Sequence, residues 1–333
     1  MKRILLYLSL LTTIVILIPT LIVLPFSSSE KQKSDIQTKV AEPEQEEEKI
    51  DIPVYRTLKK EVENVPLESY VAGVLSSEMP ANFELEALKA QALAARTYIV
   101  KQLLHPAEMN LPEGAVVTDT PLHQVYLSHD ELKELWGKDF QWKYERIQKA
   151  VQETKGKILT YDNQPITASF FSTSNGFTEN AEDYWENELP YLKSVASPWD
   201  KVSPKFQSSE TMPVKAFEEK LGISLSKEKN TGTIMKRTEG KRIAEIKIGD
   251  KTFTGREVRE KLELNSTDFS IERKGNTVSI YTKGYGHGVG MSQYGANGMA
   301  KEGRKAEEIV AHYYKGIEIS NIEPFESKLI VKN

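Results

Sequence analysis

Apolar residues recur at intervals of three and four between residues 67 and 103, and this spacing predicts two consecutive helices. The apolar stripe of the first helix consists of Leu67, Tyr70, Val71, Val74 and Leu75. The stripe of the second consists of Leu85, Leu88, Ala92, Ala95, Ile99 and Leu103. We expect Asn82 to cap the start of the second helix and His105-Pro106 to end it.

The tripeptide Glu78-Met79-Pro80 interrupts this helical pattern. Because proline disfavours helical geometry at the residue before it, Glu78 is expected at the C-terminal end of the first helix. The helix dipole is negative there, and this field and apolar surroundings both raise the pKa of a carboxyl group. A raised pKa suits a general acid near neutral pH, which makes Glu78 the candidate acid.

Alternating apolar and polar residues predict strands in much of the remaining chain. These strands cover residues 50–56, 158–161, 166–171, 231–237, 242–248, 251–254, 269–273 and 277–281. Further helices are expected at residues 144–153 and 255–262. The fold class is therefore α+β, with mixed helices and antiparallel strands forming the core. Residues 201–262 are charged and rich in predicted strands, and we interpret them as an inserted subdomain.

The N-terminus differs from everything that follows it. Residues 4–26 carry no charge, and as a helix they would be about 34 Å long, enough to span a hydrocarbon core of about 30 Å. A cleaved signal peptide is the alternative, but its apolar region is usually shorter and is followed by a small-x-small site. We therefore expect a cytoplasmic tip and one transmembrane helix at residues 1–26, with Lys2 and Arg3 on the cytoplasmic side. Residues 27–50, rich in Ser, Gln, Lys and Glu, are expected to form a flexible stalk, which leaves residues 51–333 as a domain outside the cytoplasmic membrane.

Composition narrows the chemistry. The chain has 333 residues, no cysteine and a formal net charge of −4. The lack of cysteine excludes a thiol nucleophile and a cysteine zinc site, and the negative charge argues against nucleic acid as a partner.

Two basic residues of the second predicted helix, Lys89 and Arg96, are two turns apart and share a face. They are either solvated surface charges or groups that support Glu78, and the helical pattern is compatible with both.

A strand breaks into a loop of small polar residues at positions 170–178, which offers the hydroxyls of Ser172 and Ser174. Such a loop suits either a sugar-binding cleft or an ordinary turn. No G-x-S-x-G elbow surrounds Ser172, so a serine nucleophile has little support. An aromatic and acidic cluster follows, which consists of Asp183, Tyr184, Trp185, Tyr191, Trp199 and Asp200.

A second loop, at residues 284–295, places glycines around His287 and continues into Gln293 and Tyr294. Flanking glycines leave a histidine openly presented, so His287 is a candidate site residue. The loop has no lysine followed by serine or threonine, which a phosphate-binding loop requires, and His312 is too remote in sequence to suggest a metal site.

These motifs together resemble the stage II sporulation protein D family of membrane-anchored lytic transglycosylases. The resemblance covers nearly the whole globular part, and it depends on Val65–Val74, on Ser77-Glu78-Met79-Pro80, on Glu86–Ala92 with Ala95–Tyr98, and on Gly286–Gly295. The loop Ser172–Gly176 departs from the family's usual S-x-S-G-G, since Asn175 stands at its fourth position.

The resemblance implies that Glu78 is the catalytic acid and that Lys89, Arg96 and Tyr191 support it. It implies cleavage of the N-acetylmuramic acid–N-acetylglucosamine bond of peptidoglycan with formation of 1,6-anhydro ends, in septal wall remodelling and engulfment during sporulation. Some members of the family use cysteines in a zinc site, and because this chain has no cysteine, no metal and no cofactor are expected. The expected partners are glycan strands stripped of stem peptides, together with an amidase and a membrane protein in an engulfment complex.

Two other functions remain open at this point. Related amidase enhancers suggest a non-catalytic glycan-binding protein that stimulates a separate amidase. Hydrolytic glycosidases use two carboxyls, so a muramidase with Asp200 or Asp183 as the second acid is the other alternative.

Overall fold

The computed structural model describes residues 50–106, 110–185, 187–225 and 231–330. The transmembrane helix expected at residues 1–26 and the stalk up to residue 49 lie outside the described residues. Among the described residues, no helix combines the length and the apolar composition needed to cross a membrane.

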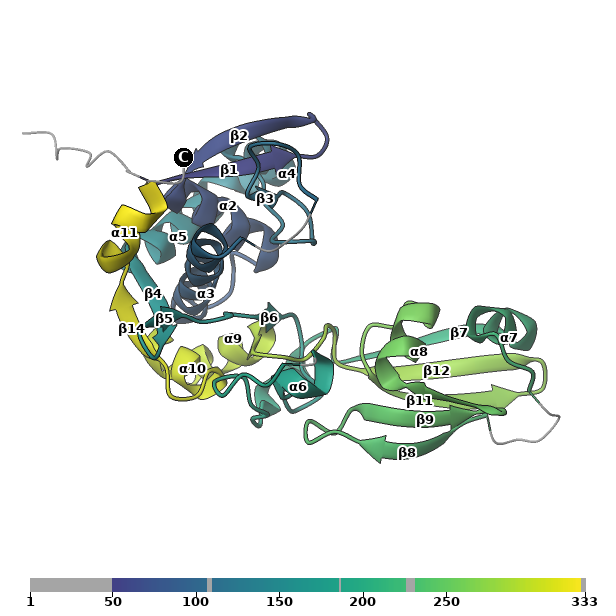
Figure 1. The fold of residues 1–333 in the computed structure, drawn as a ribbon. Helices are drawn as coiled ribbons and strands as arrows, with labels where there is room; N and C mark the ends of the chain where they lie inside the picture. Colours follow the sequence, from purple (N-terminus) through teal and green to yellow (C-terminus); the bar gives the residue numbers. More distant parts are fainter. Residues whose placement is uncertain (1–49, 107–109, 186, 226–230, 331–333) are drawn as a thin grey trace, which may run out of the picture. The chain divides into compact units, whose positions relative to one another are not determined.

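The structure is α+β, as the sequence predicts, and its sheets are mostly antiparallel. One hydrophobic cluster includes the N-terminal helices and the C-terminal segment, and its central element is α3 (Leu85–Leu104). Figure 1 shows α3 running through the middle of the other helices of this cluster. The helices of this part are α2 (Leu67–Glu78), α4 (His129–Trp136), α5 (Phe140–Glu153), α6 (Ala181–Tyr184), α9 (Gln293–Lys301), α10 (Ala306–Tyr313) and α11 (Glu323–Ile330). Two 3₁₀ turns join them, η2 (Gly137–Asp139) and η3 (Pro198–Val202).

Three small sheets border these helices. The first has the order β2-β1-β3, the second β14-β4-β5, and the third pairs β13 with β6 in parallel. Their strands are β1 (Asp51–Arg56), β2 (Glu61–Pro66), β3 (Val117–Thr118), β4 (Lys157–Tyr161), β5 (Gln164–Pro165), β6 (Phe170–Phe171), β13 (Met291–Ser292) and β14 (Glu318–Asn321). The pairing of β6 with β13 brings the two loops rich in small residues side by side, although they are more than 100 positions apart in the chain.

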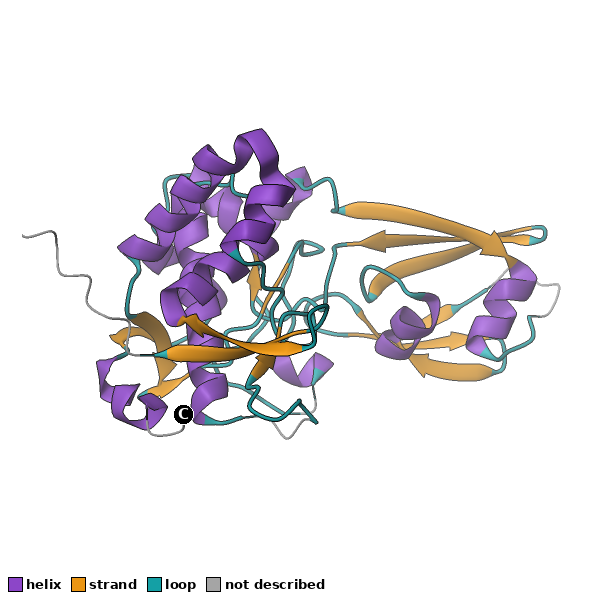
Figure 2. Cartoon of the chain, turned by 90° about the horizontal axis from the view of Figure 1, so that it is seen from above, coloured by secondary structure: helices purple, strands orange, loops and turns teal. Residues whose placement is uncertain are grey.

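A second hydrophobic cluster forms between residues 212 and 280, and its largest buried side chains include Phe217 and Phe269. It lies within two three-stranded sheets, β10-β9-β8 and β11-β12-β7, and two short helices, which Figure 2 shows against the long strands. The elements are β7 (Gln207–Pro213), α7 (Val214–Leu221), β8 (Thr233–Arg237), β9 (Ile243–Ile248), β10 (Lys251–Thr254), α8 (Gly255–Leu262), β11 (Asp268–Lys274) and β12 (Thr277–Lys283). The inserted subdomain predicted at residues 201–262 covers the first six of these elements.

Several local predictions are confirmed and others are wrong. Helix α2, the helix at 255–262 and the hairpin of β11 and β12 lie where the sequence predicts them. Asn82 does not cap α3, because the residue before the helix is Glu84, whose N–H donates to Asn297 Oδ1 at 2.8 Å. The hairpin after β4 is correct at its turn, but its second strand is only β5, since Phe170 and Phe171 pair with β13.

Candidate active site

Helix α2 ends at Glu78, as the proline in the following turn predicts. Met79 has an extended backbone (φ −127°, ψ 134°), and its N–H still donates to the carbonyl of Leu75. Because the Met79 side chain is buried, the chain is anchored immediately after the carboxyl-bearing residue. Glu78 therefore sits at a fixed helix terminus rather than on a mobile loop.

The carboxyl group of Glu78 is largely enclosed by protein. Its Oε1 accepts a hydrogen bond from the backbone N–H of Val125, with a distance of 3.1 Å. Burial raises the pKa of Glu78 above its ordinary value, and this single hydrogen bond opposes the shift only in part. A carboxyl group in this state holds its proton to higher pH than a solvated glutamate does.

Gly73 explains how the segment that carries Val125 comes so close to α2. A Cβ at this position would lie 2.4 Å from Cε2 of Tyr126 and 2.5 Å from the carbonyl oxygen of Leu127. Only glycine permits this contact, and the ring of Tyr126 then stacks on Tyr70 with 5.4 Å between centroids. The glycine five residues before Glu78 thus allows the segment that donates to its carboxyl to approach α2 closely.

Glu78 opens into a cleft of about 550 Å³. The side chains around it come from the end of α2, the turn after it, the α4–α5 region and both loops rich in small residues. They are Ser76, Ser77, Glu78, Met79, Pro80, Ala81, Asn82, Trp136, Asp139, Trp142, Lys143, Ser172, Lys205, Gln293 and Tyr294. Four residues predicted from sequence, Glu78, Ser172, Gln293 and Tyr294, therefore line one cleft.

Aromatic and basic groups of this cleft were missed by the sequence analysis. The ammonium of Lys143 lies 5.4 Å from the ring centroid of Trp136 and 5.6 Å from that of Trp142, both within reach of a cation–π contact. Trp142 is 42% exposed, and its Nε1–H donates to Asp139 at 3.3 Å. An exposed indole held in place by its own hydrogen bond provides a flat surface on which a sugar ring can stack. The sequence did contain a signal for α4, the helix that ends at Trp136. Ser128 and Glu131 form a capping box, which marks the start of this helix.

The residues from the glycine-rich segment lie at the start of α9. Ser292 caps this helix by accepting from the N–H of Gly295, which fixes the position of Gln293 and Tyr294. The ring of Tyr294 packs edge-on against Phe83, with 5.0 Å between centroids. Gln293 is buried, and within the described residues its amide nitrogen has no hydrogen-bond partner. The Gln293 amide nitrogen is therefore an unsatisfied buried donor on a residue that lines the cleft.

Lys89 and Arg96 do not line the cleft. Arg96 is fully buried and donates to both carboxylate oxygens of Glu68 through Nε, at 3.0 and 3.2 Å, and through Nη2 at 2.5 Å. It also donates to the carbonyl of Lys157 at 3.2 Å, so it connects α2 and α3 with the start of β4. Lys89 forms ion pairs with Glu86 and Glu153, at 3.1 and 3.2 Å. Both residues hold helices together. The helical pattern alone was compatible with either surface charges or groups that support Glu78.

Ser174 and Asp200 belong to a second buried group, which we call the Asp200 cluster; its other members are Ser197, Ser292 and Tyr313. Ser174 donates to Asp200 through its N–H at 2.9 Å and its hydroxyl at 2.8 Å. The hydroxyls of Ser197 and Ser292 donate to the same carboxylate at 2.5 Å each. Asp200 is fully buried and does not line the cleft, and neither does the exposed Asp183. The second carboxyl of the cleft is Asp139.

Tyr191 and His287 also lie outside the cleft lining. The hydroxyl of Tyr191 accepts from the N–H of Thr167 at 3.0 Å, and its ring packs against Tyr161. His287 is half-buried among aromatic rings, with Trp185 and Tyr184 each at 5.6 Å. Burial, helped by the charges of neighbouring arginines, lowers the pKa of His287 to about 3, so the ring is neutral at physiological pH. Its Nδ1 accepts from the N–H of Val289 at 3.0 Å, which shapes the glycine loop.

Metal binding has no evident site in the described part of the chain, where no group of three or more His, Asp or Glu side chains converges as metal ligands do.

Comparison with known proteins is consistent with these motifs. The family model "stage II sporulation protein" matches residues 55–161, which include Glu78 and the helices on either side of it. The chain is 50% identical to stage II sporulation protein D of Bacillus subtilis over the full length of both chains, and equally to that of Bacillus amyloliquefaciens. It is also 29% identical to the amidase enhancer of Bacillus subtilis, over 75% of this chain and 40% of that protein.

The match to the two sporulation proteins leaves no part of the chain uncovered, so the likeness includes the cleft, the Asp200 cluster and the strand-rich region alike. On this ground the chain belongs to the stage II sporulation protein D family.

Proposed function

We propose that this chain is a lytic transglycosylase that cleaves the N-acetylmuramic acid–N-acetylglucosamine bond of peptidoglycan during engulfment in sporulation. The observation that carries the proposal is the Glu78 carboxyl, which is held at a helix terminus, has its pKa raised by burial and opens into a cleft of about 550 Å³. Membership in a sporulation protein family supports a role in spore formation.

The reaction needs one residue that acts first as acid and then as base. Glu78 donates its proton to the glycosidic oxygen, and the bond from that oxygen to the anomeric carbon breaks. The acetamido group of the same sugar stabilises the cationic carbon. The 6-hydroxyl oxygen then bonds to this carbon and gives its proton to the Glu78 carboxylate, so the product is a 1,6-anhydro sugar and no water is consumed.

The remaining cleft residues position the glycan. Trp136 and Trp142 offer flat faces to sugar rings, and Ser172, Gln293 and Tyr294 offer hydrogen-bonding groups. Arg96 and Lys89 act at a distance: Arg96 pairs with Glu68 and joins α3 to α2, which carries Glu78, and Lys89 pairs with Glu153 and joins α3 to α5. The 1,6-anhydro outcome suits a cleft in which the second carboxyl, Asp139, is already engaged by Trp142 and lies 3.9 Å from the Lys143 ammonium.

The localisation and partners belong to the same proposal. We infer that residues 1–26 anchor the protein in the cell membrane and that residues 27–50 form a tether to the catalytic domain outside it. An amidase would supply glycan strands without stem peptides, and a membrane protein would complete the complex. Protease treatment of intact protoplasts tests the topology: the domain after residue 50 should be digested from outside while the N-terminal tip is protected.

The second candidate function is a non-catalytic glycan-binding enhancer of a separate amidase. The likeness to the amidase enhancer of Bacillus subtilis favours it, although the chain spans only 40% of that protein.

One experiment separates these functions from each other and from hydrolysis. Purified full chain is incubated with peptide-free glycan strands, and the released ends are identified by mass spectrometry. Anhydro ends support the transglycosylase, and reducing ends would indicate a muramidase that uses Asp139. Intact strands that co-sediment with the protein would indicate the enhancer.

A further inference from the structure

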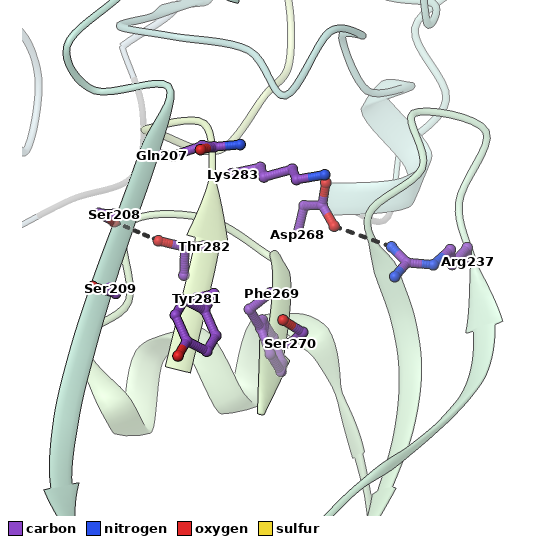
Figure 3. Close-up of a pocket in the computed structure, with 10 residues that line it drawn as sticks. All are labelled: Gln207, Ser208, Ser209, Arg237, Asp268, Phe269, Ser270, Tyr281, Thr282 and Lys283. Carbon is purple, nitrogen blue, oxygen red and sulfur yellow. Dashed lines mark hydrogen bonds and ion pairs between the residues drawn. The ribbon is translucent and has the colours of Figure 1, made fainter. Parts of the chain in front are cut away.

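The sheet β11-β12-β7 has a polar face that the second hydrophobic cluster leaves uncovered. Residues paired across the three strands form rows on this face, because side chains alternate along each strand. Gln207, Lys283 and Asp268 form one row, and Ser209, Tyr281 and Ser270 form the next. Figure 3 shows Tyr281 on the middle strand between the two serines, and Lys283 reaching across toward Asp268. The other face carries Phe269, Val278 and Ile280, which are buried.

A hollow of about 430 Å³ lies over these two rows. Arg237 closes it from the end of β8 and donates to Asp268 Oδ1 at 3.1 Å (Figure 3). Asp268 Oδ2 accepts from Asn175 at 3.0 Å, so the carboxylate is engaged from two directions. The hollow is thus walled by side chains from four strands rather than being a flat stretch of sheet.

The side chains of this hollow have the properties of a saccharide platform. Tyr281 is 45% exposed and lies among serines, a threonine and an amide, whereas the other aromatic residue of the lining, Phe269, is buried. An exposed ring offers a face for stacking, and the surrounding hydroxyls can exchange hydrogen bonds with sugar hydroxyls. An ordinary solvated sheet face would also be polar, but it would not require an unpacked tyrosine within a walled hollow.

Charge indicates which kind of saccharide fits. Lys283 and Arg237 provide two cationic groups, whereas Asp268 provides the only carboxylate of the lining. The surplus of positive charge favours a ligand with carboxylates.

The segment of residues 205–207 runs from the Glu78 cleft to the hollow. Strand pairing extends past β12, because the N–H of Gly284 donates to the carbonyl of Phe206 at 2.8 Å. At the next position Lys205 lies over the ring of Tyr285, 4.6 Å from its centroid, and Tyr285 is 41% exposed. Lys205 lines the Glu78 cleft, and Gln207, two residues further along the chain, lines the hollow.

We propose that an acidic glycan strand bound at Glu78 continues past Lys205 and Tyr285 onto the Tyr281 platform. This inference rests on the proposed function, since it extends the binding of the same polymer. It assigns the strand-rich region the task of selecting long, carboxylate-bearing strands, with Tyr281 for stacking and Lys283 and Arg237 for charge.

The test measures binding to the full chain carrying Glu78→Gln, which prevents cleavage during the measurement. The probes are long peptide-free glycan strands, a short glycan of two disaccharide units, peptide-bearing strands and neutral N-acetylglucosamine oligomers. Tyr281→Ala should weaken the binding of long peptide-free strands by roughly three- to tenfold. It should thereby reduce the preference for long over short glycans, and Tyr281→Phe should retain that preference. Lys283→Ala should weaken the binding of long acidic strands more than the binding of neutral oligomers of equal length.

Lys274→Ala is the matched control, because Lys274 is exposed at the far end of the same sheet and outside the hollow. Equal binding of long strands by Tyr281→Ala and Lys283→Ala would overturn the platform and leave the proposed function standing. If both variants weakened only peptide-bearing strands, the occupant would be the stem peptide and the glycan assignment would be wrong. If the parent protein bound none of the probes, the proposed function would fail together with this inference.

Discussion

Two carboxyl groups of this protein, the half-buried Glu78 and the fully buried Asp200, differ in the number of hydrogen-bond donors around them and in their access to a cleft. Burial raises the pKa of each above its ordinary value. Asp200 accepts hydrogen bonds from a backbone N–H and from the hydroxyls of three serines. Glu78 accepts one hydrogen bond from the described residues, and its cleft is open.

The number of donors determines what each group can do. Four donors stabilise the ionised form of Asp200 and connect η3 to the loop at Ser174 and to the start of α9, so this carboxylate serves as a structural link. A carboxyl with one donor keeps its capacity to give a proton to a ligand. Burial and a raised pKa alone therefore do not single out a candidate acid; few donors and an open cleft are also needed.

The largest expected effect is the loss of activity in Glu78→Gln. Glutamine retains the shape and can still accept from the Val125 N–H, but it has no proton to donate to the glycosidic oxygen. General acid catalysis contributes about 10²–10⁴-fold, so the rate of anhydro-end formation should fall by roughly a thousandfold. The measurement is product formation from purified glycan strands with equal amounts of folded protein.

Glu84→Gln is the control for this prediction, because Glu84 is an exposed glutamate in the same turn region and does not line the cleft. Cleavage by Glu78→Gln at the normal rate would rule out Glu78 as the acid.

Asp200→Ala should instead damage the fold. The substitution leaves one buried N–H and three buried hydroxyls without their acceptor, and each unsatisfied group costs about 1–3 kcal/mol. Because the serine hydroxyls can rotate toward other acceptors, we expect a loss of about 3–5 kcal/mol in the free energy of unfolding. Denaturant titration monitored by fluorescence measures it. A variant that unfolds like the parent but cleaves nothing would place Asp200 in the chemistry and revive the muramidase interpretation.

A third prediction compares Arg96 and Lys89, which a helical pattern cannot distinguish. Arg96→Met leaves the carboxylate of Glu68 in the protein interior, and removing one partner of a buried ion pair costs about 3 kcal/mol or more. Lys89→Met breaks ion pairs nearer the surface and should cost about 1 kcal/mol or less. Denaturant titration of both variants gives the comparison, and a large loss in Lys89→Met alone would contradict it.

The sequence predicts local structure around Glu78 better than it predicts the cleft. The end of α2 follows from a single proline, which acts on its immediate neighbour. The burial of Arg96 could not be predicted, since it depends on Glu68, which lies 28 residues away in the chain and on another helix. Lys205 and Trp142 reach the cleft through packing of distant segments, which no periodicity records. Strand β2 was missed because its outward residues are polar and its pairing with β1 is what identifies it.

The smallest expected effect concerns the free energy of unfolding, which the ionisation of Glu78 reduces. The folded state holds the proton of this carboxyl to higher pH than the unfolded chain does, where the ordinary value of 4.5 applies. Between the two pKa values the folded state binds more protons, so the free energy of unfolding decreases as the pH rises through this window. Glu78→Gln has no such ionisation and should be more stable than the parent at pH 7, by roughly 0.5–2 kcal/mol.

Below the ordinary value the parent carboxyl is protonated in both states, so the two proteins should converge in stability on acidification. Denaturant titrations at pH 4 and pH 7 measure this difference, and Asp200→Asn is the informative comparison. The Asn substitution at Asp200 should be costly at pH 7, because an amide has one acceptor oxygen in place of two and cannot accept from all four donors. Stabilisation by Glu78→Gln together with destabilisation by Asp200→Asn would show that one buried carboxyl is retained at a cost to the fold and the other for its benefit. The same sign for both would remove the distinction between acid and structural link.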